Sequence, residues 1–184
     1  MTLWLARHAE AEWPAGAALG QADPELSVGG HRTAAALAAA FADRRLDRVI
    51  ASDLCRARQT AETVAAPRGL EVETWPELRE VDFGAWEGRR LADLWTEDPE
   101  AAARWEADSR CFPAGFGESY AEFDARVRVA LGRLRTLAPA PVLVVSHGGP
   151  LRLLLALISD AELGEMWALE LPPGSVREVA WPAG

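Results

Sequence analysis

The sequence predicts a three-layer α/β/α sandwich with a mostly parallel central sheet. Short apolar stretches alternate along its 184 residues with longer segments of helical spacing, which is the pattern of a parallel sheet covered on both faces. Three of the apolar stretches end in polar pairs, "RH" at 7–8, "SD" at 52–53 and "SH" at 146–147. Ligands bind beyond the carboxyl ends of strands in such folds, so we expect these pairs to converge on one crevice.

The first half of the chain contains three expected strands. The apolar run at 3–6 predicts a strand, the Gly/Pro-containing stretch 14–30 a long loop, and the alanine-rich stretch 31–45 a helix. A second strand is expected over 48–53 and a helix over 54–66, which ends before Pro67. A third, short strand is expected over 70–75.

The second half begins with an excursion from the sheet. Residues 76–117 carry little strand signal and one helical piece over 89–98, so we expect them to cover one end of the sheet in a single domain spanning 1–184. Apolar residues spaced by three and four predict an amphipathic helix over 118–138. An apolar strand over 141–149 leads into a helix over 150–158, and the stretches 167–172 and 176–181 predict a closing hairpin.

Composition excludes several classes of function. A net charge of −9 argues against nucleic-acid binding, which needs a basic surface. The chain has no apolar run of membrane-spanning length and no secretory signal pattern, so we expect a cytoplasmic protein. Two cysteines without a C-x-x-C pair and three histidines predict neither a metal site nor a cofactor.

The basic residues are all arginines. The 19 Lys and Arg positions include no lysine, which excludes Schiff-base chemistry and a Walker A lysine. Guanidinium groups suit bidentate contacts with phosphate or carboxylate.

The expected fold gathers an anion site at the strand ends. It brings together Arg7, His8, Ser52, Arg56 and His147, with Arg56 in the first turn of a helix. Two arginines and a helix N-terminus favour an anion, and two histidines supply a nucleophile or a proton carrier. Phosphate is the expected ligand.

Five motifs in order strengthen this reading. They are "LARHAE", "ASDLCRARQTAE", "LREVDFGAWEG", "GFGESYAEFDARV" and "VVSHGGPLR". With them the chain resembles, over nearly its whole length, the histidine phosphatases, the superfamily that includes cofactor-dependent phosphoglycerate mutases. The resemblance implies a phosphoglycerate mutase-like fold and hydrolysis of a small phosphorylated metabolite. Short length and two of these segments look most like the α-ribazole phosphatase group.

The resemblance also implies roles for individual residues. His8 would be the nucleophile that forms a phosphohistidine, Glu80 the proton donor to the leaving oxygen, and His147 a hydrogen-bond donor to the transferring phosphoryl group. Phosphate would be held by Arg7, Arg56 and the backbone N–H of Gly148. By spacing alone, Asp82 rivals Glu80 as the proton donor.

Three positions depart from the family pattern and leave alternatives open. Ala9 stands where glycine is usual, Ala11 where serine or threonine is usual, and Pro14 where many members have asparagine. Loss of polar contacts at 11 and 14 leaves a phospho-ligand-binding protein with weakened turnover as an alternative. A phosphoglycerate mutase is the alternative among enzymes, but it needs extra cationic contacts in the 76–117 excursion.

Several residues outside the motifs also carry expectations. A serine esterase using Ser146 is disfavoured because the chain lacks G-x-S-x-G. Arg58 is expected to pair with Glu62. Arg152 is expected to pair with a carboxylate, and the alternative is that it extends the anion site. Tryptophans 13, 86 and 95 lie in loops that could border the substrate, and exposure there would favour a homodimer.

Overall fold

The computed structural model describes residues 2–108, 110–137, 140–161 and 169–180. Its strands are β1 (Thr2–Arg7), β2 (Arg48–Ala51), β3 (Val72–Thr74), β4 (Val142–Ser146) and β5 (Val176–Ala180). Its α-helices are α1 (Val28–Ala40), α2 (Cys55–Ala65), α3 (Leu91–Glu97), α4 (Pro99–Ala107), α5 (Tyr120–Thr136) and α6 (Gly148–Ser159). Short 3-10 turns span Ala66–Arg68, Pro76–Leu78 and Gly84–Trp86.

The strands form one sheet in the order β3-β2-β4-β1-β5. The first four lie parallel to their neighbours, and β5 runs antiparallel to β1 at the edge. Arg7 lies opposite Ser146 in the β1–β4 register, so the next residues, His8 and His147, leave the sheet at the same level. Ala51 of β2 lies opposite Val145 of β4, so Ser52 follows at the level of Ser146, and the predicted convergence of the three strand ends is confirmed.

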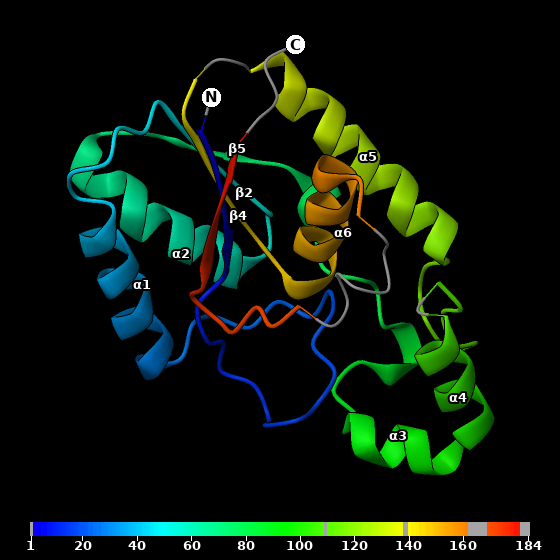
Figure 1. The fold of residues 1–184 in the computed structure, drawn as a ribbon. Coiled ribbons are helices and arrows are strands. Elements are labelled where there is room, and N and C mark those ends of the chain that lie inside the picture. The colour runs from blue at the N-terminus through cyan, green and yellow to red at the C-terminus, as the bar shows by residue number, and fades with distance from the viewer. Residues whose placement is uncertain (1, 109, 138–139, 162–168, 181–184) are drawn as a thin grey trace.

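Helices cover both faces of the sheet (Figure 1). One face carries α1 and α2, and the other carries α5 and α6. Alternate strand residues enter the two cores: Trp4 and Val145 pack on the α1/α2 side, whereas Leu5 and Val144 pack on the α5/α6 side. This confirms the predicted three-layer sandwich.

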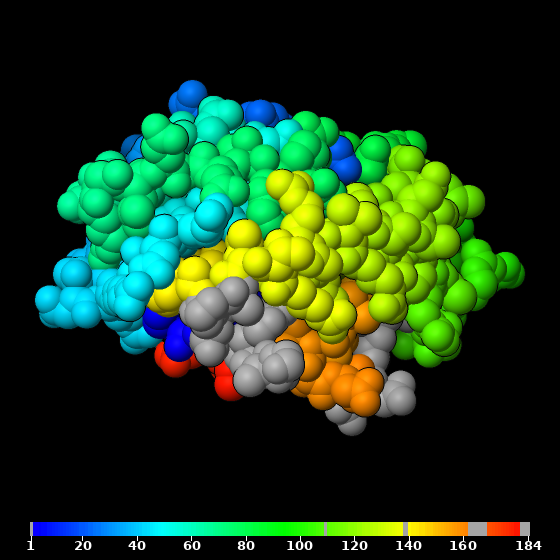
Figure 2. Space-filling model, turned by 90° about the horizontal axis from the view of Figure 1, so that it is seen from above, coloured from blue at the N-terminus to red at the C-terminus, as the bar shows by residue number. Residues whose placement is uncertain are grey.

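The two ends of the sheet differ. Helices α3 and α4 project to one side beyond the carboxyl ends of the strands (Figure 1). Seen from above, segments from both halves of the chain share the surface, with cyan and green chain beside the yellow-green of α5 (Figure 2). No helix in the described part of the chain has the length and apolar character needed to cross a bilayer.

Some predicted boundaries are wrong. Helix α1 begins at Val28 rather than residue 31, because the hydroxyl of Ser27 accepts from the N–H of Gly30 and caps the helix, and it ends at Ala40. Helix α6 likewise begins at Gly148, two residues before the predicted start. The excursion contains a second helix, α4, which the side chain of Asp98 caps.

The predicted closing hairpin is also wrong. β5 pairs with β1, and residues 169–172 lie outside any strand; residues 167–168 are outside the described chain. The carbonyl oxygen of Leu171 accepts a hydrogen bond from Nη1 of Arg7 at 2.7 Å. This segment therefore supports the end of β1 instead of forming a strand.

Candidate active site

His8 and His147 lie side by side at the carboxyl ends of β1 and β4. Their ring centroids are 4.9 Å apart, and both side chains are buried. Nδ1 of His8 lies 2.7 Å from the carbonyl oxygen of Ala9, and a carbonyl can only accept, so Nδ1 carries the proton. This leaves a lone pair on Nε2 of His8.

Burial keeps both imidazoles neutral. Desolvation, followed by the charge of Arg56, lowers the pKa of His8 to about 3, and the Arg7 charge lowers it further. Desolvation and the Arg56 charge also place the pKa of His147 well below its ordinary value. At neutral pH, His8 is thus an unprotonated base and a potential nucleophile.

Arg56 is fully buried in the first turn of α2. Its Nη1 and Nη2 donate to the carbonyl oxygens of Ala22 (2.8 Å) and Gly20 (2.6 Å), and its Nε donates to Nε2 of His8 (3.3 Å). Burial lowers the pKa of Arg56 to about 10, which still leaves it charged at neutral pH. The loop before α1 thus fixes a guanidinium against His8.

Some buried polar atoms in this site lack partners. Within the described chain, Nε of Arg7 and both ring nitrogens of His147 are buried without a hydrogen-bond partner. Such atoms cost free energy unless a ligand or water satisfies them. They are donors and acceptors available to an anion beside His8.

Glu80 lies at the N-terminus of α6. Its Oε1 accepts from the N–H groups of Val81 (2.9 Å) and Gly149 (3.1 Å), and its side chain is buried. A Cβ on Gly148 would come 2.7 Å from Nη1 of Arg152, 3.6 Å from Oε2 of Glu80 and 3.8 Å from Cζ of Arg7, so glycine permits this close approach. Asp82, the alternative proton donor, instead accepts from the N–H of Gly84.

A cavity of about 280 Å³ opens beside Glu80. Its polar lining is Arg7, Glu80, Gly148, Gly149 and Arg152, and its apolar lining is Ala17, Ala18, Leu19, Val81, Phe83, Leu91 and Trp105. His8, His147 and Arg56 are not among its lining residues, although Arg7 continues directly into His8. Ala11 and Pro14 do not line it either.

Other expectations have mixed outcomes. Arg58 pairs with Glu62 at 3.4 Å, as predicted. Nε of Arg152 donates to the carbonyl oxygen of Leu169, and the residue lines the cavity beside Glu80. The hydroxyl of Ser146 donates to the carbonyl oxygen of Leu78, a structural contact that leaves no support for a serine esterase.

The tryptophan expectation was largely wrong. Trp86 is buried against Trp95, with ring centroids 4.9 Å apart, and Nε1 of Trp13 donates to the carbonyl oxygen of Ala18. Trp105 on α4 lines the cavity instead. The sequence carried no signal for this residue, because its helix was not predicted.

Neutral histidines, a fixed guanidinium and a buried carboxyl at the strand ends of an α/β fold define a phosphoryl-transfer class of protein. The chain belongs to the histidine phosphatase superfamily (branch 1), whose family model matches residues 3–184. The predicted resemblance is therefore confirmed.

Several relatives over most of the chain are named phosphatases. The adenosylcobalamin/alpha-ribazole phosphatase of Salmonella typhimurium is 36% identical over 176 residues, 95% of this chain and 87% of the relative. Phosphoserine phosphatase 1 of Hydrogenobacter thermophilus is 33% identical over 168 residues, 90% of this chain and 80% of the relative. The crystal structure of the alpha-ribazole phosphatase from Shigella flexneri superposes with a TM-score of 0.86 at 34% identity, covering 98% of this chain and 90% of that one.

Proposed function

We propose that this protein hydrolyses a small phosphomonoester through a phosphohistidine on His8, without a metal or another cofactor. The observation that carries the proposal is the neutral imidazole of His8, whose Nε2 lies 3.3 Å from Nε of the buried Arg56. A guanidinium fixed in advance stabilises the charge that spreads over phosphoryl oxygens in the transition state. The phosphatase names of the relatives support the same reaction.

The proposed first step transfers the phosphoryl group to His8. Nε2 of His8 attacks phosphorus, the bond to the leaving oxygen breaks, and the protonated carboxyl of Glu80 supplies a proton to that oxygen. Arg7, Arg56, His147 and the N–H of Gly148 would bind the phosphoryl oxygens. In the second step Glu80 takes a proton from water, whose oxygen attacks phosphorus and releases His8 and phosphate.

Hydrolysis is favoured over a mutase reaction by the cationic groups of the excursion. Its five described arginines each have an acidic partner within the chain: Arg79 with Asp53, Arg89 with Glu97, Arg90 with Asp93, Arg104 with Glu100, and Arg110 with Asp108. A guanidinium that neutralises a neighbouring carboxylate is less available to hold a second acidic group of a phosphoglycerate.

The leaving group is proposed to be apolar or ring-shaped. Leu19, Phe83, Leu91 and Trp105 give one wall of the cavity an apolar surface. With the alpha-ribazole phosphatase names of relatives, this makes α-ribazole phosphate the first metabolite to test. Phosphoserine and 3-phosphoglycerate are the comparison substrates, since one relative is named a phosphoserine phosphatase.

Activity is favoured over a binding role that has lost turnover. Ala11 forms a backbone bridge with Leu26, and the site keeps the neutral His8 beside the buried Arg56, which the proposed turnover requires. The net charge of −9 supports a small phosphorylated ligand rather than nucleic acid. A single domain, a homodimer and a cytoplasmic location stay predictions.

The test is hydrolysis of para-nitrophenyl phosphate in EDTA by the wild type, His8→Ala and His31→Ala. His31 is an exposed histidine on α1 and serves as the matched control. We expect the wild type and His31→Ala to turn over equally and His8→Ala to lose at least about 10³-fold. Equal turnover by His8→Ala would refute the phosphohistidine. No wild-type turnover of this substrate or the three metabolites would favour the binding protein.

A further inference from the structure

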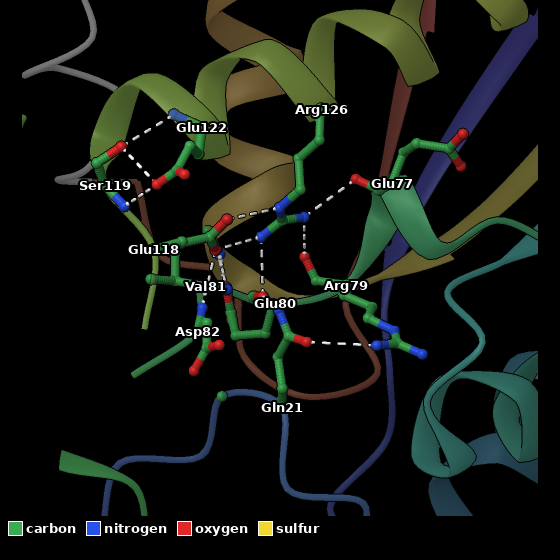
Figure 3. Close-up of polar contacts among 12 residues, drawn as sticks. Gln21, Glu77, Arg79, Glu80, Val81, Asp82, Glu118, Ser119, Glu122 and Arg126 are labelled. Atoms are coloured by element: carbon green, nitrogen blue, oxygen red, sulfur yellow. Dashed lines mark hydrogen bonds and ion pairs between the residues drawn. The ribbon is translucent and has the colours of Figure 1, made fainter. Parts of the chain in front are cut away.

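Arg126 on α5 directs three of its five N–H donors at backbone carbonyls of the segment that carries Glu80 (Figure 3). Nη1 donates to the carbonyl oxygens of Glu77 (3.1 Å) and Arg79 (2.6 Å), and Nη2 donates to the carbonyl oxygen of Glu80 (2.9 Å). The remaining donors bind the carboxylate of Glu118, with Nη2–Oε1 at 2.7 Å and Nε–Oε2 at 2.9 Å. One side chain thus binds three backbone carbonyls at or just before Glu80.

Glu118 extends this arrangement to the far side of Glu80. Its Oε1 also accepts from the backbone N–H of Asp82 at 2.8 Å. The backbone is therefore held before Glu80, at Glu80 and two residues after it. The side chains of Arg126 and Glu118 are only 19% and 11% exposed, so solvent competes little for these contacts.

The geometry points to Arg126, together with Glu118, as a positioning residue for Glu80. The segment 79–82 has no helix or strand to fix it, and its carbonyls need partners from elsewhere. A proton donor must lie within hydrogen-bond reach of the leaving oxygen, so a small displacement of its backbone lowers its contribution. Arg126 touches neither cavity nor substrate site and acts through Glu80.

This inference rests on the proposed role of Glu80 as proton donor, and the test separates the two. Proton donation matters most for a strongly basic leaving group, so the readout is the ratio of kcat/KM for β-glycerol phosphate and for para-nitrophenyl phosphate. A fall in the folded fraction lowers both values equally and cancels in the ratio. A merely structural role would leave the ratio unchanged.

The variants are Glu80→Gln, Arg126→Gln, Glu118→Gln and the control Arg133→Gln. Arg133 lies on the same helix and reaches the same segment, but through the carboxylate of Glu77 (3.1 Å) and the ring of Trp75 (3.8 Å), not through the carbonyls. We expect Arg126→Gln to lower the ratio about 10-fold, Glu80→Gln to lower it by more, and Arg133→Gln to leave it unchanged. Glu118→Gln should give a smaller loss.

The outcomes distinguish failure of the positioning role of Arg126 from failure of Glu80 as the proton donor. A lowered ratio in Glu80→Gln with a wild-type ratio in both Arg126→Gln and Glu118→Gln would overturn the positioning role and leave the proposed reaction intact. A wild-type ratio in Glu80→Gln itself would overturn Glu80 as proton donor, and the inference with it. If Arg126→Gln does not fold, Arg126→Lys decides, because a lysine cannot span three carbonyls and a carboxylate.

Discussion

The backbone N–H of His8 donates to the carbonyl oxygen of Ser146 at 2.9 Å, so the last ladder contact of β1 with β4 joins the two histidine-bearing strand ends. His147 follows Ser146 directly, and the imidazoles come within 4.9 Å. The separation of the two rings is therefore set by sheet register rather than by a loop. Register is strongly specified here because both strands are buried on both faces.

Burial of neutral His8 predicts a loss of stability in acid. The pKa is about 3 in the folded protein and near 6.5 when unfolded, so the unfolded chain binds more protons between these values. The stability that neutral His8 contributes is fully present above pH 6.5 and is lost as the pH drops toward 3. Between pH 7 and 4.5 we expect the wild type to lose on the order of 2 kcal/mol more free energy of unfolding than His8→Asn.

Urea unfolding at the two pH values measures this difference. His31→Asn, which changes an exposed histidine on α1, should follow the wild type. Identical pH dependence in His8→Asn and the wild type would contradict a buried neutral imidazole.

Gly149→Ala should displace the Glu80 carboxyl. A methyl group at this position would overlap Oε1 of Glu80 and lie 3.2 Å from Cγ2 of Val81. We expect kcat/KM for β-glycerol phosphate to fall about 100-fold, the size of a lost general-acid contribution. Gly132→Ala on α5, where a methyl group meets nothing within 4 Å, should leave activity unchanged. Full activity in Gly149→Ala would show that the carboxyl tolerates displacement.

Arg56→Lys should disable the proposed phosphate site although it keeps the charge. A lysine cannot hold the carbonyls of Gly20 and Ala22 while also reaching His8, so the cation loses its fixed orientation. We expect kcat/KM to fall by about 10² to 10³. The control is Arg58→Lys, an exposed position paired with Glu62. Equal losses in both variants would refute a special role for Arg56.

Ser27→Ala should affect stability alone. The Ser27 hydroxyl accepts from the N–H of Gly30 at 2.9 Å and offsets the poor helix propensity of two glycines in the first turn of α1. Its loss should cost about 1 kcal/mol of unfolding free energy, measured in urea, and Ser27→Asp should restore most of it. If the free energy of unfolding is the same in Ser27→Ala and the wild type, water replaces the hydroxyl as the acceptor for the N–H of Gly30.

Much of the fold could be predicted from the sequence because the central strands are short apolar runs ending in polar pairs. The convergence of Arg7, His8 and His147 followed from that pattern and from the parallel topology. The pairing of β5 with β1 could not be predicted, since residues next to each other in sequence usually pair and here they do not.

The rest of the site depends on contacts that periodicity does not encode. Arg126 occupies a polar position of an amphipathic helix, and nothing in its spacing shows that three carbonyls face it. Trp105 lies on α4, whose packing depends on rings from distant segments, such as Phe116 at 5.7 Å. Tertiary context determines both positions.

The position of β1 between β4 and β5 has a consequence for biosynthesis. The strand that carries His8 is made well before both of its neighbours, residues 142–146 and 176–180, and Arg7 also needs the carbonyl oxygen of Leu171. At about 5–20 residues per second, the ribosome leaves this strand unpaired for on the order of ten seconds or more. A nascent chain should therefore bind no phosphate until its last strand has emerged.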